Sequence, residues 1–131
     1  MMIDYFELYT TCLKVIAGKH PEQTLDFINL MRDEPVIKSE LAKGTDNRQL
    51  VEATYQVLDN LIAEGLVNAS KTVTKTPDPI YTFKGLSTIG YYYLKSLEDP
   101  TFSDKLKSSL KEEGIPLTPT AISKFIAKLT L

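Results

Sequence analysis

The amino-acid sequence predicts an α+β fold that is mostly helical, and three observations lead to this class. Apolar residues recur at helical spacing through most of the 131 residues. The period changes from 3.6 to 2 after Gly65, and helical spacing returns after Gly85. The composition, 43% hydrophobic and 24% charged, is typical of a globular chain. One domain over residues 1–131 is therefore expected.

Two helices are expected at the start of the chain. The first runs from Ile3 to Ala17 on an apolar stripe, and Gly18 ends it. The second runs from Pro21 to about Arg32 and turns Leu25 inward. Pro35 closes this helix, because the residue before a proline is pushed away from helical backbone angles.

A short helix, a tight turn and a long helix are expected next. The short helix covers Lys38 to Lys43 and turns Leu41 and Ala42 inward, and Gly44 opens the turn. The long helix starts at Asp46 and stops at Gly65. Its apolar face holds Leu50, Val51, Thr54, Val57, Leu58, Leu61 and Ile62. Its opposite face holds Gln49, Glu52, Ala53, Gln56 and Asn60.

Residues 66–74 and 80–83 alternate as two strands of a hairpin, with a proline-containing turn between them. A helix follows from Thr88 to Leu97 and turns Ile89 inward. A charged helix, capped by Thr101 or Ser103, continues to about Glu113. A last helix opens at Thr118 and Pro119 and carries an apolar face through Leu129.

Helix, short helix, turn, long helix and hairpin is the element order of a winged helix-turn-helix domain with a two-stranded wing. In this division residues 1–35 are N-terminal helices, residues 36–86 form the helix-turn-helix and wing, and residues 87–131 are C-terminal helices. The stretch from Ser39 to Val67 resembles the second and third helices of winged-helix proteins. The stretch from Tyr81 to Leu129 is similar to the YjcQ-like proteins and to a related, uncharacterised phage-associated family. This resemblance implies a fold and an origin in phages, prophages or Gram-positive bacteria, and it implies no activity.

DNA binding is the function that this interpretation favours, as a transcriptional regulator of phage, prophage or bacterial origin. A helix in the major groove of double-stranded DNA reads bases with a few polar side chains, and the candidates are Arg48, Gln49, Gln56 and Asn60. Contacts to phosphate dominate affinity, and the candidates are Lys38, Lys43, Asn47, Lys71 and Lys75. Asp46 and Glu52 lie among these residues; a glutamate can accept a hydrogen bond from cytosine, but an acid on this face more often repels the DNA backbone.

The charge balance favours an alternative, a non-catalytic protein-protein interaction module on the same scaffold. The chain has 15 basic and 17 acidic residues, a net charge of −2, so its overall field does not attract phosphate. A continuous positive stripe over the predicted cations would favour DNA, and a broken stripe would favour the interaction module. The sequence names no small-molecule effector.

Self-association is expected from aromatic and apolar residues in the last third of the chain. Tyr91 and Tyr92 fall on the outer sides of their helix, and tyrosine is favoured at the centre of interfaces. The last helix ends in an apolar run that includes Phe125 and Leu129 and must pack on its own domain or on a partner. These four residues are the predicted interface of a homodimer.

No catalytic signature is present in the sequence, so we expect no enzyme activity, no cofactor and no metal site. His20 is the only histidine, and Cys12 is the only cysteine and lies on an apolar stripe. A single cysteine, no apparent signal peptide and no long apolar run lead us to expect a cytoplasmic protein without a membrane span.

Overall fold

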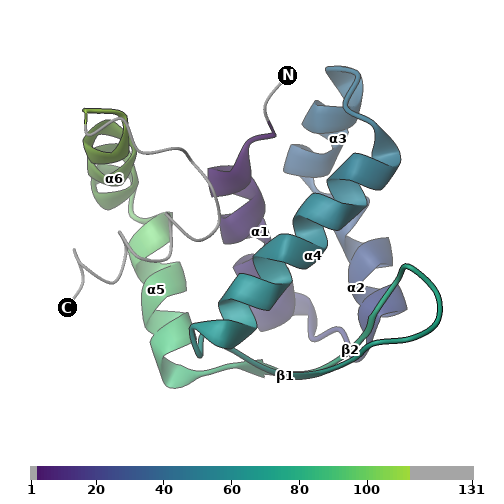
Figure 1. Cartoon of the computed structure of the whole chain (residues 1–131). Coiled ribbons are helices and arrows are strands. Elements are labelled where there is room, and N and C mark those ends of the chain that lie inside the picture. Colours follow the sequence, from purple (N-terminus) through teal and green to yellow (C-terminus); the bar gives the residue numbers. More distant parts are fainter. Residues whose placement is uncertain (1–2, 113–131) are drawn as a thin grey trace.

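The computed structural model describes residues 3–112 and shows a mostly helical α+β fold (Figure 1). In the described residues the helices are α1 (Tyr5–Lys19), α2 (Thr24–Met31), α3 (Pro35–Ala42), α4 (Asn47–Ala63), α5 (Thr88–Glu98) and α6 (Pro100–Glu112). The strands are β1 (Val67–Thr72) and β2 (Ile80–Leu86). The fold class that the sequence predicts is therefore confirmed at the level of α+β, mostly helical. The helix expected over residues 118–129 lies outside the described residues.

Helix α1 is the centre of the core. It packs against α2, α3, α4, α5 and β2, and Figure 1 shows it behind α4. Side chains on most of its circumference are buried, among them Leu8, Tyr9, Cys12 and Leu13, each with none of its surface exposed. Asp4 caps its start by accepting a hydrogen bond from the Glu7 backbone N–H at 3.1 Å.

The two strands form an antiparallel hairpin whose register runs from Val67 opposite Leu86 to Thr72 opposite Ile80. A bulge between Asn68 and Ala69 shifts the register near the base of the hairpin. The connection before α2 extends the sheet, because the Phe83 N–H donates to the Glu22 carbonyl at 2.8 Å. This bond fixes the start of α2 against β2.

The boundaries of the first two helices differ from those predicted. Helix α1 runs through Gly18, and the chain turns at His20, which has a φ of 50°. Helix α2 begins at Thr24 because Gln23 is bridged to Thr82 of β2. Leu25, predicted to face inward, is 72% exposed.

The start of α3 also differs, and the difference changes its buried face. Pro35 is the first residue of α3, a position where its missing N–H costs nothing. The earlier start buries Val36, Ile37 and Glu40. Leu41, predicted to face inward, is 42% exposed, and Ala42 is exposed as well.

Three smaller predictions on the later helices are wrong. Ala53 is buried in α4 and not part of its outer face. Ile89 of α5, predicted to face inward, is 54% exposed, whereas Tyr93, Leu94 and Leu97 are buried. Helix α6 begins at Pro100, before both expected caps, Thr101 and Ser103, and the Asp99 carboxylate accepts from the Thr101 N–H at 2.9 Å. Within residues 3–112, no helix combines the length and apolar character that a membrane crossing requires.

Candidate functional site

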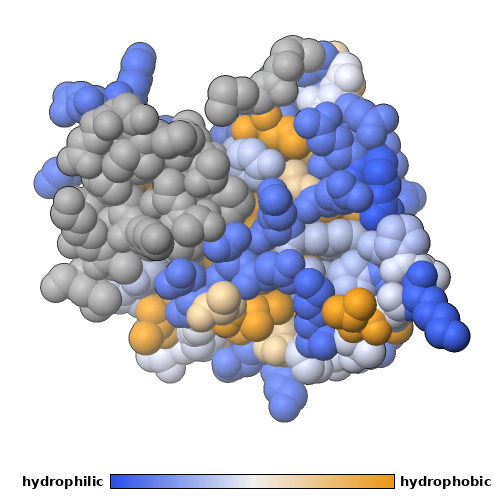
Figure 2. All heavy atoms as spheres, viewed as in Figure 1, coloured by the Kyte–Doolittle hydropathy of each residue, from blue (hydrophilic) through white to orange (hydrophobic). Residues whose placement is uncertain are grey.

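The predicted DNA-reading surface centres on α4, which lies at the front of the molecule with the hairpin below it (Figure 1). The long helix begins where the sequence predicts, because the Asp46 carboxylate accepts from the Gln49 N–H at 3.0 Å. Asn47, Arg48, Gln49 and Gln56 are exposed. Figure 2 shows this face as largely hydrophilic, with separate apolar patches toward the hairpin.

Arg48 is held by two carboxylates at the start of α4. Its guanidinium lies 3.2 Å from Glu52 and 2.8 Å from Asp78 in the hairpin loop, and it also donates to the Pro77 carbonyl at 3.4 Å. The hydroxyl of Tyr55 donates to the same Asp78 oxygen at 3.0 Å. Arg48 therefore joins the hairpin loop to α4 through contacts that compete with any contact to a DNA base.

These contacts shift the pKa values of the three groups. The hydrogen bond from Arg48, followed by that from Tyr55, lowers the pKa of Asp78 below its ordinary value. The hydrogen bond to Asp78 raises the pKa of Arg48. Burial, together with the bond to Asp78, raises the pKa of Tyr55 to about 12. All three groups favour the state in which Asp78 is ionised and Tyr55 keeps its proton.

Two other predicted DNA-binding cations, Lys71 and Lys43, are also ion-paired. Lys71 on β1 lies 3.1 Å from Asp59 of α4, and Asp59 accepts a 2.7 Å hydrogen bond from the buried Tyr81 hydroxyl. Lys43 lies 3.0 Å from Glu40, whose side chain is 1% exposed. The second carboxylate oxygen of Glu40 is buried without a hydrogen bond among the described residues.

The continuous positive stripe that would favour DNA binding is therefore broken. Of the five predicted basic residues, Lys43, Arg48 and Lys71 are paired with carboxylates, and the other two, Lys38 and Lys75, are exposed without an ion pair in the described part of the chain. The Gln56 side chain accepts a long hydrogen bond, 3.5 Å, from Tyr5. The half-buried Asn60 donates its side-chain amide to the Gln56 carbonyl at 2.9 Å, which turns it away from a groove-reading role.

An apolar groove next to this surface was not predicted. We call it the α2–α4 groove: it is a depression of about 430 Å³ between α2, α4 and the end of the hairpin loop, lined in part by Leu25, Ile28, Val51 and Ile80. Leu25 is 72% exposed and Ile80 is 44% exposed. The sequence could not reveal this groove, because the pattern of α2 assigns Leu25 to the core.

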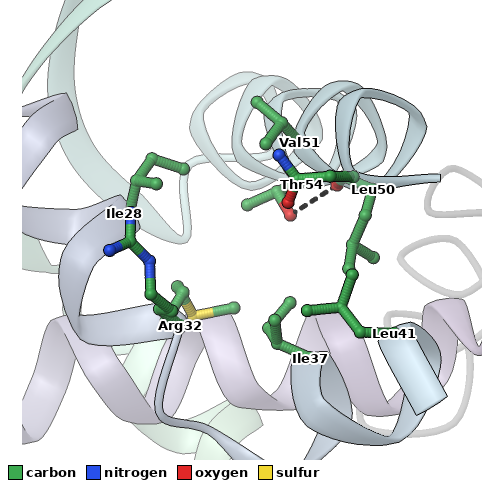
Figure 3. Close-up of a pocket in the computed structure, with 9 residues that line it drawn as sticks. Ile28, Arg32, Ile37, Leu41, Leu50, Val51 and Thr54 are labelled. Carbon is green, nitrogen blue, oxygen red and sulfur yellow. Dashed lines mark hydrogen bonds between the residues drawn. The ribbon is translucent and has the colours of Figure 1, made fainter. Parts of the chain in front are cut away.

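The groove continues into a pocket of about 360 Å³ between α2, α3 and α4 (Figure 3). We call it the α3 pocket. It shares Ile28 and Val51 with the α2–α4 groove. Figure 3 shows Ile37 and Leu41 of α3 facing Leu50 and Thr54 of α4 across it.

The residues predicted for self-association are only partly described. Tyr91 and Tyr92 are 50% and 53% exposed on α5, as their helical positions predict. Phe125 and Leu129 lie outside the described residues. A homodimer through this surface stays a prediction, which a monomeric mass in solution across micromolar concentrations would contradict.

Cys12 is expected to be unreactive in the folded protein. It is fully buried on α1, and burial raises the pKa of its thiol far above the ordinary value. Because the thiolate is the reactive form, we expect the thiol reagent DTNB to label Cys12 only as fast as the protein unfolds. If DTNB labelled the native protein rapidly, and urea did not increase the labelling rate, this expectation would be contradicted.

The described residues contain no group of three His, Cys, Asp or Glu residues placed to hold a metal ion.

Asp78→Asn is expected to loosen the hairpin loop. The pKa of Asp78 is lowered in the fold, so its contacts are present above the pKa of the unfolded chain and are lost as the pH falls through the lower, folded value. The Thr76 N–H donates to the Thr74 hydroxyl at 3.2 Å within this loop. Its protection against hydrogen exchange, relative to the intrinsic rate at the same pH, is expected to fall in Asp78→Asn at neutral pH, and in wild type only at strongly acidic pH. Asp104→Asn, an exposed change on α6, is the control. Equal exchange in both variants would show that Asp78 does not hold the loop.

Comparison of the chain with protein-family models, with curated proteins and with solved structures finds no match. The resemblance to the YjcQ-like proteins thus remains an expectation from the sequence, and the site is interpreted on its own geometry.

Proposed function

We propose that the chain is a non-catalytic protein-interaction module on a winged-helix scaffold, and that it binds its partner in the α2–α4 groove. The observation that carries this proposal is the contrast between two neighbouring surfaces. The predicted DNA-reading surface has most of its cations neutralised, whereas the groove beside it exposes aliphatic side chains from two elements.

The exposure of Leu25 and Ile80 supports a binding role for the groove. Both side chains extend into solvent from elements that are otherwise anchored in the core, at 72% and 44% exposure. An exposed apolar residue is ordinary by itself, but apolar residues gathered around a concave surface are typical of interaction sites. Burying them against a partner would release their hydration water and stabilise the complex.

The anchoring of α2 also supports this role. Thr24 at the start of α2 donates to the Pro79 carbonyl at 3.2 Å and accepts from the Tyr81 N–H at 2.6 Å. The two sides of the groove are thereby held at a fixed separation before any partner binds. Such preorganisation lowers the entropy cost of association.

Site-specific photocrosslinking tests the proposal in cells that express the protein. A benzophenone amino acid at Leu25 is expected to give one discrete protein adduct on irradiation, and the same amino acid at Lys105, exposed on α6, is expected to give none. Adding Ile80→Lys to the Leu25 probe should abolish the adduct, because the charge would have to be buried at the interface. Equal adducts from both positions, or no adduct at Leu25, would contradict the proposal.

DNA binding is a second candidate, and a specific observation favours it. Lys38 and Lys75 lack ion pairs in the described region, and Gln49 and Gln56 stay exposed on α4. Fluorescence anisotropy with a duplex pool, at low and at physiological salt, tests this candidate. Binding that weakens with salt, with a log-log slope that falls by about one unit in Lys38→Ala or Lys75→Ala, would support it. No binding at low salt would exclude it.

A further inference from the structure

We propose that the α3 pocket binds a small amphiphilic carboxylate, with its apolar part inside the pocket and its carboxylate on Arg32. The pocket measures about 360 Å³, which lies within the range of small-molecule sites. Ligand binding at this site does not depend on the proposed protein-interaction function, although the two sites are adjacent.

The interior of the pocket is built for an apolar group. Met31 and Leu50 are each 2% exposed and Ile37 is 8% exposed, so these side chains form a floor that belongs to the core. Ile28 and Val51 are half-buried and form the sides. Each methylene of a ligand buried here would raise its affinity by about fourfold.

The charge at the pocket is entirely of one sign. Arg32 lines it, and no Asp or Glu does. The Arg32 guanidinium is exposed and makes no ion pair or hydrogen bond within residues 3–112, whereas its sequence neighbour Glu34 pairs with Lys19 at 3.3 Å. Figure 3 shows Arg32 at the edge of the cavity. An unpaired guanidinium beside an apolar cavity favours a ligand with a carboxylate at one end.

The start of α4 also lines the pocket, through Asn47, the first residue of this 17-residue helix. The Asp46 carboxylate caps this helix by accepting from the Gln49 N–H at 3.0 Å, so the preference of the helix N-terminus for negative charge is already met by the chain itself. Thr54 already donates its hydroxyl to the Leu50 carbonyl at 2.9 Å, so it can accept but not donate a further hydrogen bond there. Among the residues that line the pocket, Arg32 alone is charged, so it is the group that selects a carboxylate.

Octanoate is the probe that we would titrate into the full chain, followed by methyl NMR. Saturable shifts are expected at Ile28, Ile37, Leu41 and Val51, and octylamine is expected to bind at least tenfold more weakly. Arg32→Gln should weaken octanoate by about tenfold or more, the range for a charged hydrogen bond. Lys105→Gln, which removes an exposed cation on α6 outside the pocket, should leave the affinity unchanged.

Several outcomes would overturn the proposal. The absence of saturable shifts up to millimolar octanoate would do so, as would equal affinities for octanoate and octylamine. Shifts at Leu25 and Ile80 alone would place the ligand in the α2–α4 groove instead. Saturation by an acidic helical peptide but not by octanoate would make the pocket part of a protein-binding surface. If Arg32→Gln fails a circular-dichroism check of folding, Leu41→Gln at the exposed pocket edge replaces it, with the same expected loss.

Discussion

Gly90→Ala is expected to destabilise the protein by about 3 kcal/mol, the upper range for forcing extra atoms into a packed site. A Cβ at Gly90 would overlap the Leu66 carbonyl oxygen. That oxygen cannot move freely, because it accepts from the Ser87 N–H at 2.9 Å and from the Ser87 hydroxyl at 3.2 Å. Relieving the overlap requires α5 to move away from the end of α4.

Gly18→Ala is the matched control for this substitution. Gly18 also lies within a helix, α1, but no atom lies within 4 Å of a Cβ built there. Alanine is favoured over glycine inside a helix by about 0.5–1 kcal/mol, so this variant should be more stable than wild type. Urea unfolding measures both free energies. Equal effects of the two substitutions would contradict the close packing of α5 on Leu66.

Phe27→Ala is expected to cost about 3–5 kcal/mol, the range for removing a buried aromatic ring. Phe27 has none of its surface exposed, and its ring centroid lies 5.3 Å from that of Phe83 on β2. It is the main apolar link between α2 and the hairpin. Its loss should therefore open the α2–α4 groove as well as lower the overall stability.

Leu25→Ala provides the comparison on the same helix. Leu25 is 72% exposed, so truncating it should change the free energy of unfolding by less than about 0.5 kcal/mol. Urea denaturation of both variants separates the two roles. A loss of several kcal/mol in Leu25→Ala would show that this side chain belongs to the core, as the sequence predicts, and would remove the main support for a binding groove.

Local signals predict the long helix and the hairpin well. Asp46 and Gly65 mark the two ends of α4 through capping, which depends only on neighbouring residues. The change of period after Gly65 identifies both strands, although β2 extends to Leu86, because pairing resumes beyond the bulge with Gly85 opposite Asn68 and Leu86 opposite Val67.

The region before α4 depends on contacts that are distant in sequence. Phe83 bonds to the Glu22 carbonyl and thereby delays the start of α2, and no pattern within α2 reveals this. A proline can follow the end of one helix or occupy the first position of the next. The sequence alone therefore does not show that Pro35 starts α3.

The candidate site shows the same limit. Residue type and helical position correctly predict that Gln49, Glu52 and Gln56 of α4 are exposed, but they do not predict ion pairing. Asp78 is 30 residues from Arg48 in the chain, and only the folded hairpin brings the two together. The groove beside them arises from the same tertiary placement of α2.

DNA binding by a charge-altered variant tests the central claim most directly, namely that carboxylates cancel the predicted DNA-binding cations on α4 and the hairpin. In Glu52→Gln/Asp59→Asn/Asp78→Asn, the partners of Arg48 and Lys71 lose their charge. By anisotropy at low salt, we expect wild type not to bind a duplex pool and the triple variant to bind it with a steep salt dependence. Equally tight, salt-sensitive binding by wild type would contradict the claim and return α4 to the role of a DNA-reading helix.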